Sequence, residues 1–307
     1  MTIRSVSLTA VALTGLLLIA ACGAPDDEPP AADPTTPAPP TAPPGQDGIG
    51  EPPADPVATN ETLAVYYVGE ESIVVEGGGS QQRPRLYREF RQLEVGDGSA
   101  AARVEAAVAH MLTPGSALDP DYDSGWPDSA TVTGVAVAGS TATVDLAGAA
   151  SHSVGSEAAH IAVQQLVWTA TADPDVDQVE LLINGAAVDE LWGHVGIDAP
   201  LTRAPALDTL ALLWLISPQH GDTVPGTFEV HIYGAPFEAT AQLRVREGDT
   251  VVHEQHVTLG GTGFPDFFGE AKVELTLDAG SYTLEVFELS AMDGSEIRLD
   301  DKAITVS

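Results

Sequence analysis

The chain has 307 residues, with 12 lysines and arginines against 45 aspartates and glutamates, and its formal net charge is −33 at pH 7. So negative a surface repels phosphate backbones, and we therefore expect no nucleic-acid partner. The length predicts about two domains. The single cysteine, Cys22, leaves no disulfide or thiolate metal centre, so packing must supply the stability.

The first 21 residues have the pattern of a secretory signal. One early charge, Arg4, precedes a mainly apolar run from Val6 to Ala21, which ends in small residues. The quartet at its end resembles the bacterial lipobox, and this resemblance implies cleavage before a lipidated cysteine. The lipobox residues are Ile19, Ala20 and Ala21, followed by Cys22. A transmembrane anchor is disfavoured, because it needs about 20 apolar residues and no basic stop-transfer cluster follows.

We therefore expect residues 1–21 to be a signal peptide and the lipid on Cys22, palmitate included, to be the membrane contact. Two or three acyl chains hold a protein stably at a membrane, whereas one holds it reversibly. The predicted location is the extracytoplasmic face of the cell membrane. Residues 22–60 then form a linker, since they are rich in proline and acidic residues and contain no lysine or arginine.

Residues 61–204 predict an α+β domain of two helices with hairpins on a small mixed sheet. Alternating apolar residues over Leu63–Val68 and Leu86–Leu93 predict strands on either side of a triple glycine. A helix should follow Ser99 as N-cap, with a second one capped by Ser156. Gly139-Ser140 and Asn184-Gly185 have the composition of two-residue hairpin turns.

Residues 208–307 predict an all-β immunoglobulin-like sandwich. Alternation such as Phe228, Val230, Ile232 recurs at short intervals, separated by turn signals such as Gly248-Asp249. About seven short strands in such a length are typical of this fold. The cysteine pair of antibody domains is absent.

An acidic loop offers the strongest metal candidate in the sequence. Asp119, Asp121 and Asp123 alternate like the start of an EF-hand. The pattern then departs from an EF-hand, because Ser124 stands where glycine is needed and Ala130 where a bidentate glutamate is needed. We therefore expect a solvated acidic loop, no bound metal and no cofactor.

Sequence signatures of catalysis are also missing. The chain has no GxSxG, no HExxH and no phosphate-binding GK[ST] loop. We therefore expect a protein that is not an enzyme. A hydrolase remains an alternative, and it requires His152 and His160 to cluster with the Asp119 loop.

Four arginines lie close together in this acidic chain: Arg83, Arg85, Arg88 and Arg91. On a strand, Arg88 would point away from the face that the other three share. They could form a docking patch for an acidic partner, although internal pairing with nearby carboxylates is the favoured interpretation.

The segments also resemble two known domains. Tyr66-Tyr67, Arg88-Glu89, the helix end at Ala106–Pro114, the hairpin segment Ala142–Leu146 and the stretches Val179–Gly185 and Pro200–Arg203 look like a GerMN domain of sporulation and germination proteins. The stretches Ile216–Val224, Pro236–Ala239 and Ser290–Glu296 look like the immunoglobulin-like domain of bacterial spore germination. The resemblance implies an envelope lipoprotein without agreed catalytic residues, and it suggests docking or self-association.

The sequence thus predicts a non-enzymatic, membrane-anchored lipoprotein that acts as a protein-interaction or assembly module. Its partner would be an envelope protein or a cell-wall polymer, and an exposed apolar patch on the sandwich would favour this reading. The alternative is a binder of cell-wall glycan or a small ligand, in a groove near Trp192, Trp214 and Tyr233. Trp214 lies in a strongly apolar stretch, which is more typical of core.

Overall fold

The structure is a computed structural model that describes residues 59–75, 79–197, 200–261 and 267–307. All of these residues belong to one compact unit, Pro53–Ser307. Among them, no helix combines the length and the apolar character needed to cross a bilayer.

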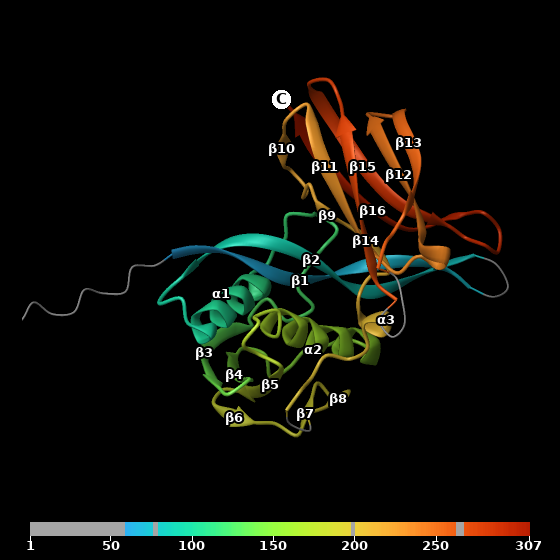
Figure 1. The fold of residues 1–307 in the computed structure, drawn as a ribbon. Helices are drawn as coiled ribbons and strands as arrows, with labels where there is room; N and C mark the ends of the chain where they lie inside the picture. The colour runs from blue at the N-terminus through green and yellow to red at the C-terminus, as the bar shows by residue number, and fades with distance from the viewer. Residues whose placement is uncertain (1–58, 76–78, 198–199, 262–266) are drawn as a thin grey trace, which may run out of the picture. The chain divides into compact units, whose positions relative to one another are not determined.

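A long antiparallel hairpin opens the described chain (Figure 1). Its strands are β1 (Thr59–Val74) and β2 (Ser80–Val95), which pair in register from Thr59 with Val95 to Val74 with Ser80. Both strands were predicted, but each is 16 residues long and extends well beyond its alternating apolar segment. The polar ends of β1 and β2 still form strand because the backbone of each end pairs with the facing end of the other strand.

Two helices lie between this hairpin and the mixed sheet (Figure 1). They are α1 (Ala100–Leu112) and α2 (Ser156–Ala170). Ser99 caps α1 as predicted, because its hydroxyl accepts from the amide of Ala102. The cap predicted for α2 was wrong by one residue: Gly155 is the N-cap, and no side chain caps the helix.

The mixed sheet has the order β3-β4-β5-β6. Strands β4 and β5 are parallel, and α2 provides the crossover between them, whereas the outer pairs are antiparallel hairpins. A small hairpin of β7 and β8 follows. The bounds are β3 Thr131–Ala138, β4 Thr141–Ala147, β5 Gln178–Ile183, β6 Ala186–Ala187, β7 Glu190–Leu191 and β8 Val195–Gly196.

The remaining strands form a two-sheet sandwich, preceded by the short helix α3 (Ala206–Thr209). One sheet has the order β10-β16-β15-β12-β13 and the other β14-β11-β9. A single 3₁₀ turn, Phe237–Ala239, leads into β12. The bounds are β9 Leu213–Ser217, β10 Thr223–Val224, β11 Thr227–Gly234, β12 Thr240–Glu247, β13 Thr250–Thr258, β14 Gly269–Thr276, β15 Gly280–Leu289 and β16 Glu296–Val306.

Two hydrophobic cores stabilise these layers, and they divide the chain unevenly. One core lies inside the sandwich and includes Val230, Leu243 and Leu284. The other fills the α+β part, yet it also contains Trp214 of β9 and Phe268. The predicted fold class, an α+β part followed by an immunoglobulin-like sandwich, is confirmed.

Candidate functional site

The four arginines predicted as a patch all lie on β2, but they have different neighbours. Arg91 lies 3.2 Å from the Glu89 carboxylate, and Arg85 lies 3.6 Å from Glu71. Internal pairing therefore engages these two, and docking through the four stays a prediction. The lipobox residues and Cys22 lie outside the described residues.

The acidic loop is solvated only in part: Asp121 and Asp123 are exposed as predicted, whereas Asp119 is not. Asp119 is buried, with 3 % of its surface exposed, and its carboxylate accepts from the ammonium of Lys302 at 2.5 Å. Lys302 also donates to Asp300 at 2.8 Å, and Tyr122 donates to the same carboxylate. The expectation failed at Asp119 because Lys302 of β16, far along the chain, neutralises this carboxylate.

The residues required for a hydrolase lie in separate surroundings. His152 packs edge-on against Trp192 at 5.1 Å, and His160 lines a hollow with Arg83 and Ser156. Within the described residues, neither histidine shares a hydrogen bond or an ion pair with Asp119, Asp121 or Asp123. Within the described ranges, no three His, Cys, Asp or Glu side chains are placed to hold a metal ion.

Two of the three aromatic residues predicted for a ligand groove come together. The rings of Trp214 and Tyr233 lie 4.9 Å apart, whereas Trp192 packs against Trp126 at 5.1 Å. Trp214 is buried, as its apolar surroundings indicated. Its ring also lines a cavity, so burial in the core and a place in a pocket are compatible for this residue.

This cavity, here called the aromatic pocket, has a volume of about 320 Å³. It combines side chains from β1, β2 and α2 with others from α3, β9 and β11. Two arginines and five aromatic residues dominate its wall. The lining residues are Tyr66, Arg88, Trp168, Arg203, Ala206, Leu210, Trp214, Tyr233 and Phe268.

Both arginines of the pocket pack on aromatic rings. The guanidinium carbon of Arg88 lies 5.1 Å from the Phe90 ring centroid and 5.4 Å from that of Tyr233. Arg203 lies 4.2 Å over Trp168 and donates through Nε to Thr171. The pKa of Arg203 is lowered, chiefly by desolvation of its guanidinium, and the positive charge of Arg88 adds to this effect.

Within the described structure, Arg88 and Arg203 lack the carboxylate partners that most other arginines of the chain have. Among the described arginines, only Arg83, Arg88 and Arg203 have no carboxylate within 4.0 Å. Acidic residues outnumber basic ones almost fourfold in this chain. Two unpaired cations at one cavity therefore need a physical explanation.

Three nitrogen donors beside the pocket are buried without a hydrogen-bond partner in the described structure: Arg88 Nε, Trp168 Nε1 and Trp214 Nε1. Leaving one such group unsatisfied costs about 1–3 kcal/mol. The other two tryptophans differ, since Trp126 and Trp192 donate to the carbonyls of Ala162 and Ala149, both at 2.8 Å. The polar groups of the pocket wall thus carry positive potential that no carboxylate among the described residues offsets within 4.0 Å.

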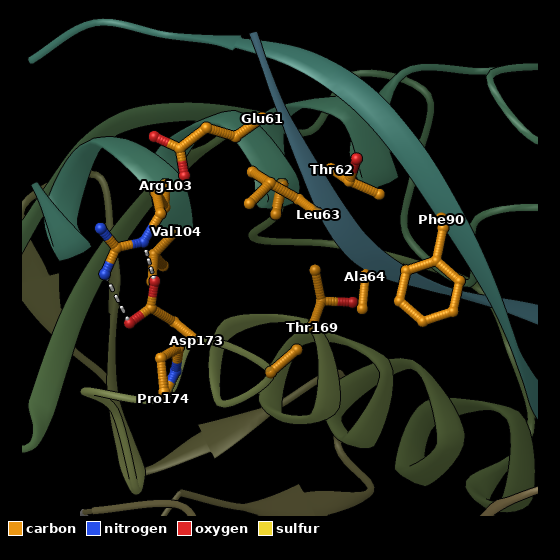
Figure 2. Close-up of a pocket in the computed structure, with 12 residues that line it drawn as sticks. Glu61, Thr62, Leu63, Ala64, Phe90, Arg103, Val104, Thr169, Asp173 and Pro174 are labelled. Carbon is orange, nitrogen blue, oxygen red and sulfur yellow. Dashed lines mark hydrogen bonds and ion pairs between the residues drawn. The ribbon is translucent and has the colours of Figure 1, made fainter. Parts of the chain in front are cut away.

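A larger hollow of about 490 Å³ between β1, α1 and the end of α2 provides a contrast (Figure 2). Its arginine, Arg103, donates to both oxygens of Asp173 at 2.6 and 3.2 Å, and also to Asp175. Figure 2 shows this pair at one end of the hollow and Phe90 at the other. Because the charge is already neutralised, this hollow is a weaker candidate for ligand binding despite its size.

Another cavity lies between α3 and the connection from β11 to β12, and it is here called the apolar hollow. It has a volume of about 540 Å³ and is lined by Leu207, Ala235, Pro236, Phe237, Glu238, Ala239 and Phe267. Three of its large apolar side chains are exposed: Phe237 by 61 %, Phe267 by 44 % and Leu207 by 39 %. An apolar patch of this kind often marks an interaction site.

The sequence did not predict the remaining members of the aromatic pocket. Tyr66 and Trp168 lie on apolar stretches that indicate core, and Arg203 follows them at a distance along the chain. One signal was present: Arg88 was expected to point away from the other three arginines of its strand. The pairing of β1 with β2 places it opposite Tyr66.

Comparisons with known proteins agree with this architecture. Residues 64–189 match the family model Germane, described as sporulation and spore germination. Residues 212–295 match Gmad2, described as an immunoglobulin-like domain of bacterial spore germination. No curated protein matches the chain.

Several solved structures show partial similarity. The first GerMN domain of the sporulation protein GerM from Bacillus subtilis is 22 % identical, with a TM-score of 0.33, covering 44 % of this chain and 97 % of that one. The tandem GerMN domains of the same protein are 16 % identical, with a TM-score of 0.34, covering 49 % of this chain and 47 % of that one. A candidate lipoprotein from Clostridium perfringens is 15 % identical, with a TM-score of 0.32, covering 47 % of this chain and 87 % of that one.

The two family matches follow each other without overlap and agree with the resemblance found in the sequence. This protein therefore carries a GerMN domain of the sporulation and spore germination type, followed by an immunoglobulin-like domain of bacterial spore germination.

Proposed function

We propose that this protein is a lipoprotein held at the extracytoplasmic face of the cell membrane through Cys22. Its folded part would dock another envelope protein without catalysing a reaction. The lipobox supports the anchor, and the two domain families support a role of the sporulation or germination type. The predicted linker of residues 22–60 is shortened at its end by β1, which begins at Thr59, and its acidic part before β1 would separate the folded part from the membrane.

The observation that carries the docking proposal is the apolar hollow. Leu207, Phe237 and Phe267 expose large apolar surfaces around one cavity. Burying such area is the main source of affinity between proteins, and aromatic anchors in a pocket often dominate it. The four arginines of β2 offer less, because Arg85 and Arg91 are already paired with carboxylates.

The occupant we propose is an apolar segment of a different envelope protein that carries basic residues beside it. The net charge of −33 makes a second copy of this chain repel the first at long range. A basic partner is attracted instead, and Glu238 lies at the hollow itself. Self-association is therefore the competing outcome of the test.

The anchor is tested first, by labelling cells with a palmitate analogue and separating membranes from soluble protein. We expect the wild type to take up label and to sediment with membranes. Cys22→Ala should lose both properties, because the lipidated thiol is absent. Labelling that persists in Cys22→Ala would contradict the lipid anchor.

Docking is tested with a photo-crosslinking amino acid at position 237 in the lipidated protein. We expect one envelope protein to crosslink stoichiometrically, and the purified partner to bind again in vitro. The control is position 292, because Met292 is 64 % exposed and lies outside the apolar hollow. Phe237→Asp should abolish rebinding, whereas Met292→Asp should leave it unchanged.

Two results would contradict this proposal. Equal crosslinking from positions 237 and 292 would show that contact is unspecific. A crosslink between two copies of this chain, accompanied by a dimer in sedimentation, would replace the foreign partner with self-association.

A further inference from the structure

We propose that the aromatic pocket binds a small organic carboxylate with a ring-sized body, such as a carboxylated sugar or an aromatic acid. This inference concerns a different surface from the apolar hollow, since the two share no lining residue. It therefore succeeds or fails independently of the docking proposal.

The charge of the ligand follows from the unpaired arginines. Arg88 and Arg203 lack a carboxylate among the described residues, while Arg85, Arg91 and Arg103 each have one. The two cations also lie close enough for Arg88 to lower the pKa of Arg203. An anion between them would relieve this repulsion, and in a partly buried site salt screens that attraction less than at the surface.

The shape of the anionic group follows from how the arginines are held. Rings cover their flat faces: Phe90 and Tyr233 pack on Arg88, and Trp168 packs on Arg203. A guanidinium whose face is covered still presents N–H groups at its edge, in a fork that matches the two oxygens of a carboxylate. The fixed planes therefore favour a planar carboxylate.

The indole groups add to the same preference. Trp168 and Trp214 are buried, and neither Nε1–H has a partner in the described structure. Their uncompensated N–H dipoles lie in the wall beside the arginines. Among the residues that the structure describes, no carboxylate lines the pocket to compete with a ligand for these positive groups.

The size of the ligand follows from the cavity. A volume of about 320 Å³ is at the lower end of the range for small-molecule sites. Ring atoms of Tyr66, Tyr233 and Phe268 form part of the cavity wall, which suits an apolar or ring-shaped body. The pocket thus fits one ring with a carboxylate rather than a polymer lying along its length.

The test is NMR of the four indole N–H signals, recorded on the whole chain from residue 22 onward with Cys22→Ala. The probes are N-acetylmuramic acid and N-acetylphenylalanine, each paired with a neutral counterpart, N-acetylglucosamine and N-acetylphenylalaninamide. We expect at least one acid to shift the Trp168 and Trp214 signals saturably, while neither neutral probe does. The acid that binds more tightly identifies a sugar or an amino-acid source.

The chain contains its own controls for this experiment. Trp126 and Trp192 already donate to backbone carbonyls and lie outside the pocket, so their signals should stay unchanged. Arg88→Gln and Arg203→Gln should each weaken binding by about tenfold or more, as loss of a charge-assisted hydrogen bond does. Arg91→Gln, on the same strand but paired with Glu89, should change affinity less than about twofold.

Three outcomes would overturn the proposal. The first is no saturable shift of the Trp168 or Trp214 signal with either acid up to about 10 mM, a weak limit for a specific site. The second is equal binding of an acid and its neutral counterpart. The third is a loss of affinity in Arg91→Gln as large as in Arg88→Gln, with the Trp126 and Trp192 signals confirming that both variants are folded.

Discussion

Lys302 and Lys272 are the only lysines of the chain, and they lie in opposite environments. Lys302 is buried, and its ammonium donates to Asp119, Tyr122 and Asp300 at 2.5, 2.7 and 2.8 Å. Desolvation lowers its pKa, but the charges of Asp300 and Asp119 outweigh this effect and raise the pKa above its usual value. Lys272 instead pairs with Glu229 at 3.3 Å, and both side chains are about half exposed.

Replacing each lysine by methionine separates these two roles. We expect Lys302→Met to lower the free energy of unfolding by about 3–5 kcal/mol, because two buried carboxylates lose their counterion. Lys272→Met should cost less than about 1 kcal/mol, as exposed pairs do. Urea unfolding at pH 7 measures both values. Similar losses in the two variants would contradict the assignment of Lys302 as a buried counterion.

Tyr67 gives the fold a dependence on alkaline pH. Its hydroxyl shares a 3.1 Å hydrogen bond with Ser116, and burial raises the pKa of Tyr67 from 10.0 to about 12. The unfolded chain ionises this group first, so its contribution to stability is full below pH 10 and is lost as pH rises toward 12.

The comparison of wild type with Tyr67→Phe isolates this contribution. Between pH 9 and 11.5, the difference in free energy of unfolding should change by about 2 kcal/mol in favour of the variant. Urea titrations at the two pH values measure this change. Parallel pH profiles of the two proteins would show that Tyr67 does not titrate differently in the folded state.

At the scale of elements, the two helix starts show which N-cap residues can be predicted from the sequence and which cannot. Ser99 was predicted as a cap and is one, because its hydroxyl reaches the amide of Ala102. Ser156 has the same residue type, yet it is the first residue of α2 and makes no cap bond. Residue preference identifies the region of a helix start, whereas the backbone path fixes which side chain reaches an amide.

The two serines therefore make a matched test of capping. We expect Ser99→Ala to lower the free energy of unfolding by about 1 kcal/mol, since α1 loses a hydrogen bond to a terminal amide. Ser156→Ala should change it by less than about 0.5 kcal/mol. Thermal or urea unfolding of both variants provides the measurement. Equal losses would mean that Ser156 acts as a cap in solution.

At the scale of the whole molecule, local patterns predicted the layers but not what joins them. The N-cap serines predicted both helices, and alternation with turn residues predicted the hairpins and the strands of the sandwich, because each of these signals lies within a few residues. Tyr66, Trp168 and Trp214 meet at one pocket from three distant segments. No single-sequence pattern encodes such a meeting, and the pairing of Asp119 with Lys302 escaped prediction for the same reason.

The contacts between the α+β part and the sandwich predict that they unfold together. Trp214 and Phe268 belong to the same core as the α+β residues. The side chain of Gln219 bonds both the amide and the carbonyl of Phe90, at 2.7 and 2.8 Å, as a neighbouring strand would. Glu71 of β1 accepts from the amide of Leu212 at 2.7 Å. Separating the parts would leave these groups without partners.

Hydrogen exchange tests this coupling directly. In the wild type, we expect the most protected amides of α1 and of β12 to open with the same free energy, equal to that of global unfolding. Trp214→Ala should lower both values by about 3–5 kcal/mol, because the removed ring belongs to the core that joins the parts. Val230→Ala is a second test from within the sandwich core. If the unit is cooperative, this variant should also lower the opening free energies of both α1 and β12. A loss in β12 with unchanged protection in α1 would show that the two domains unfold separately.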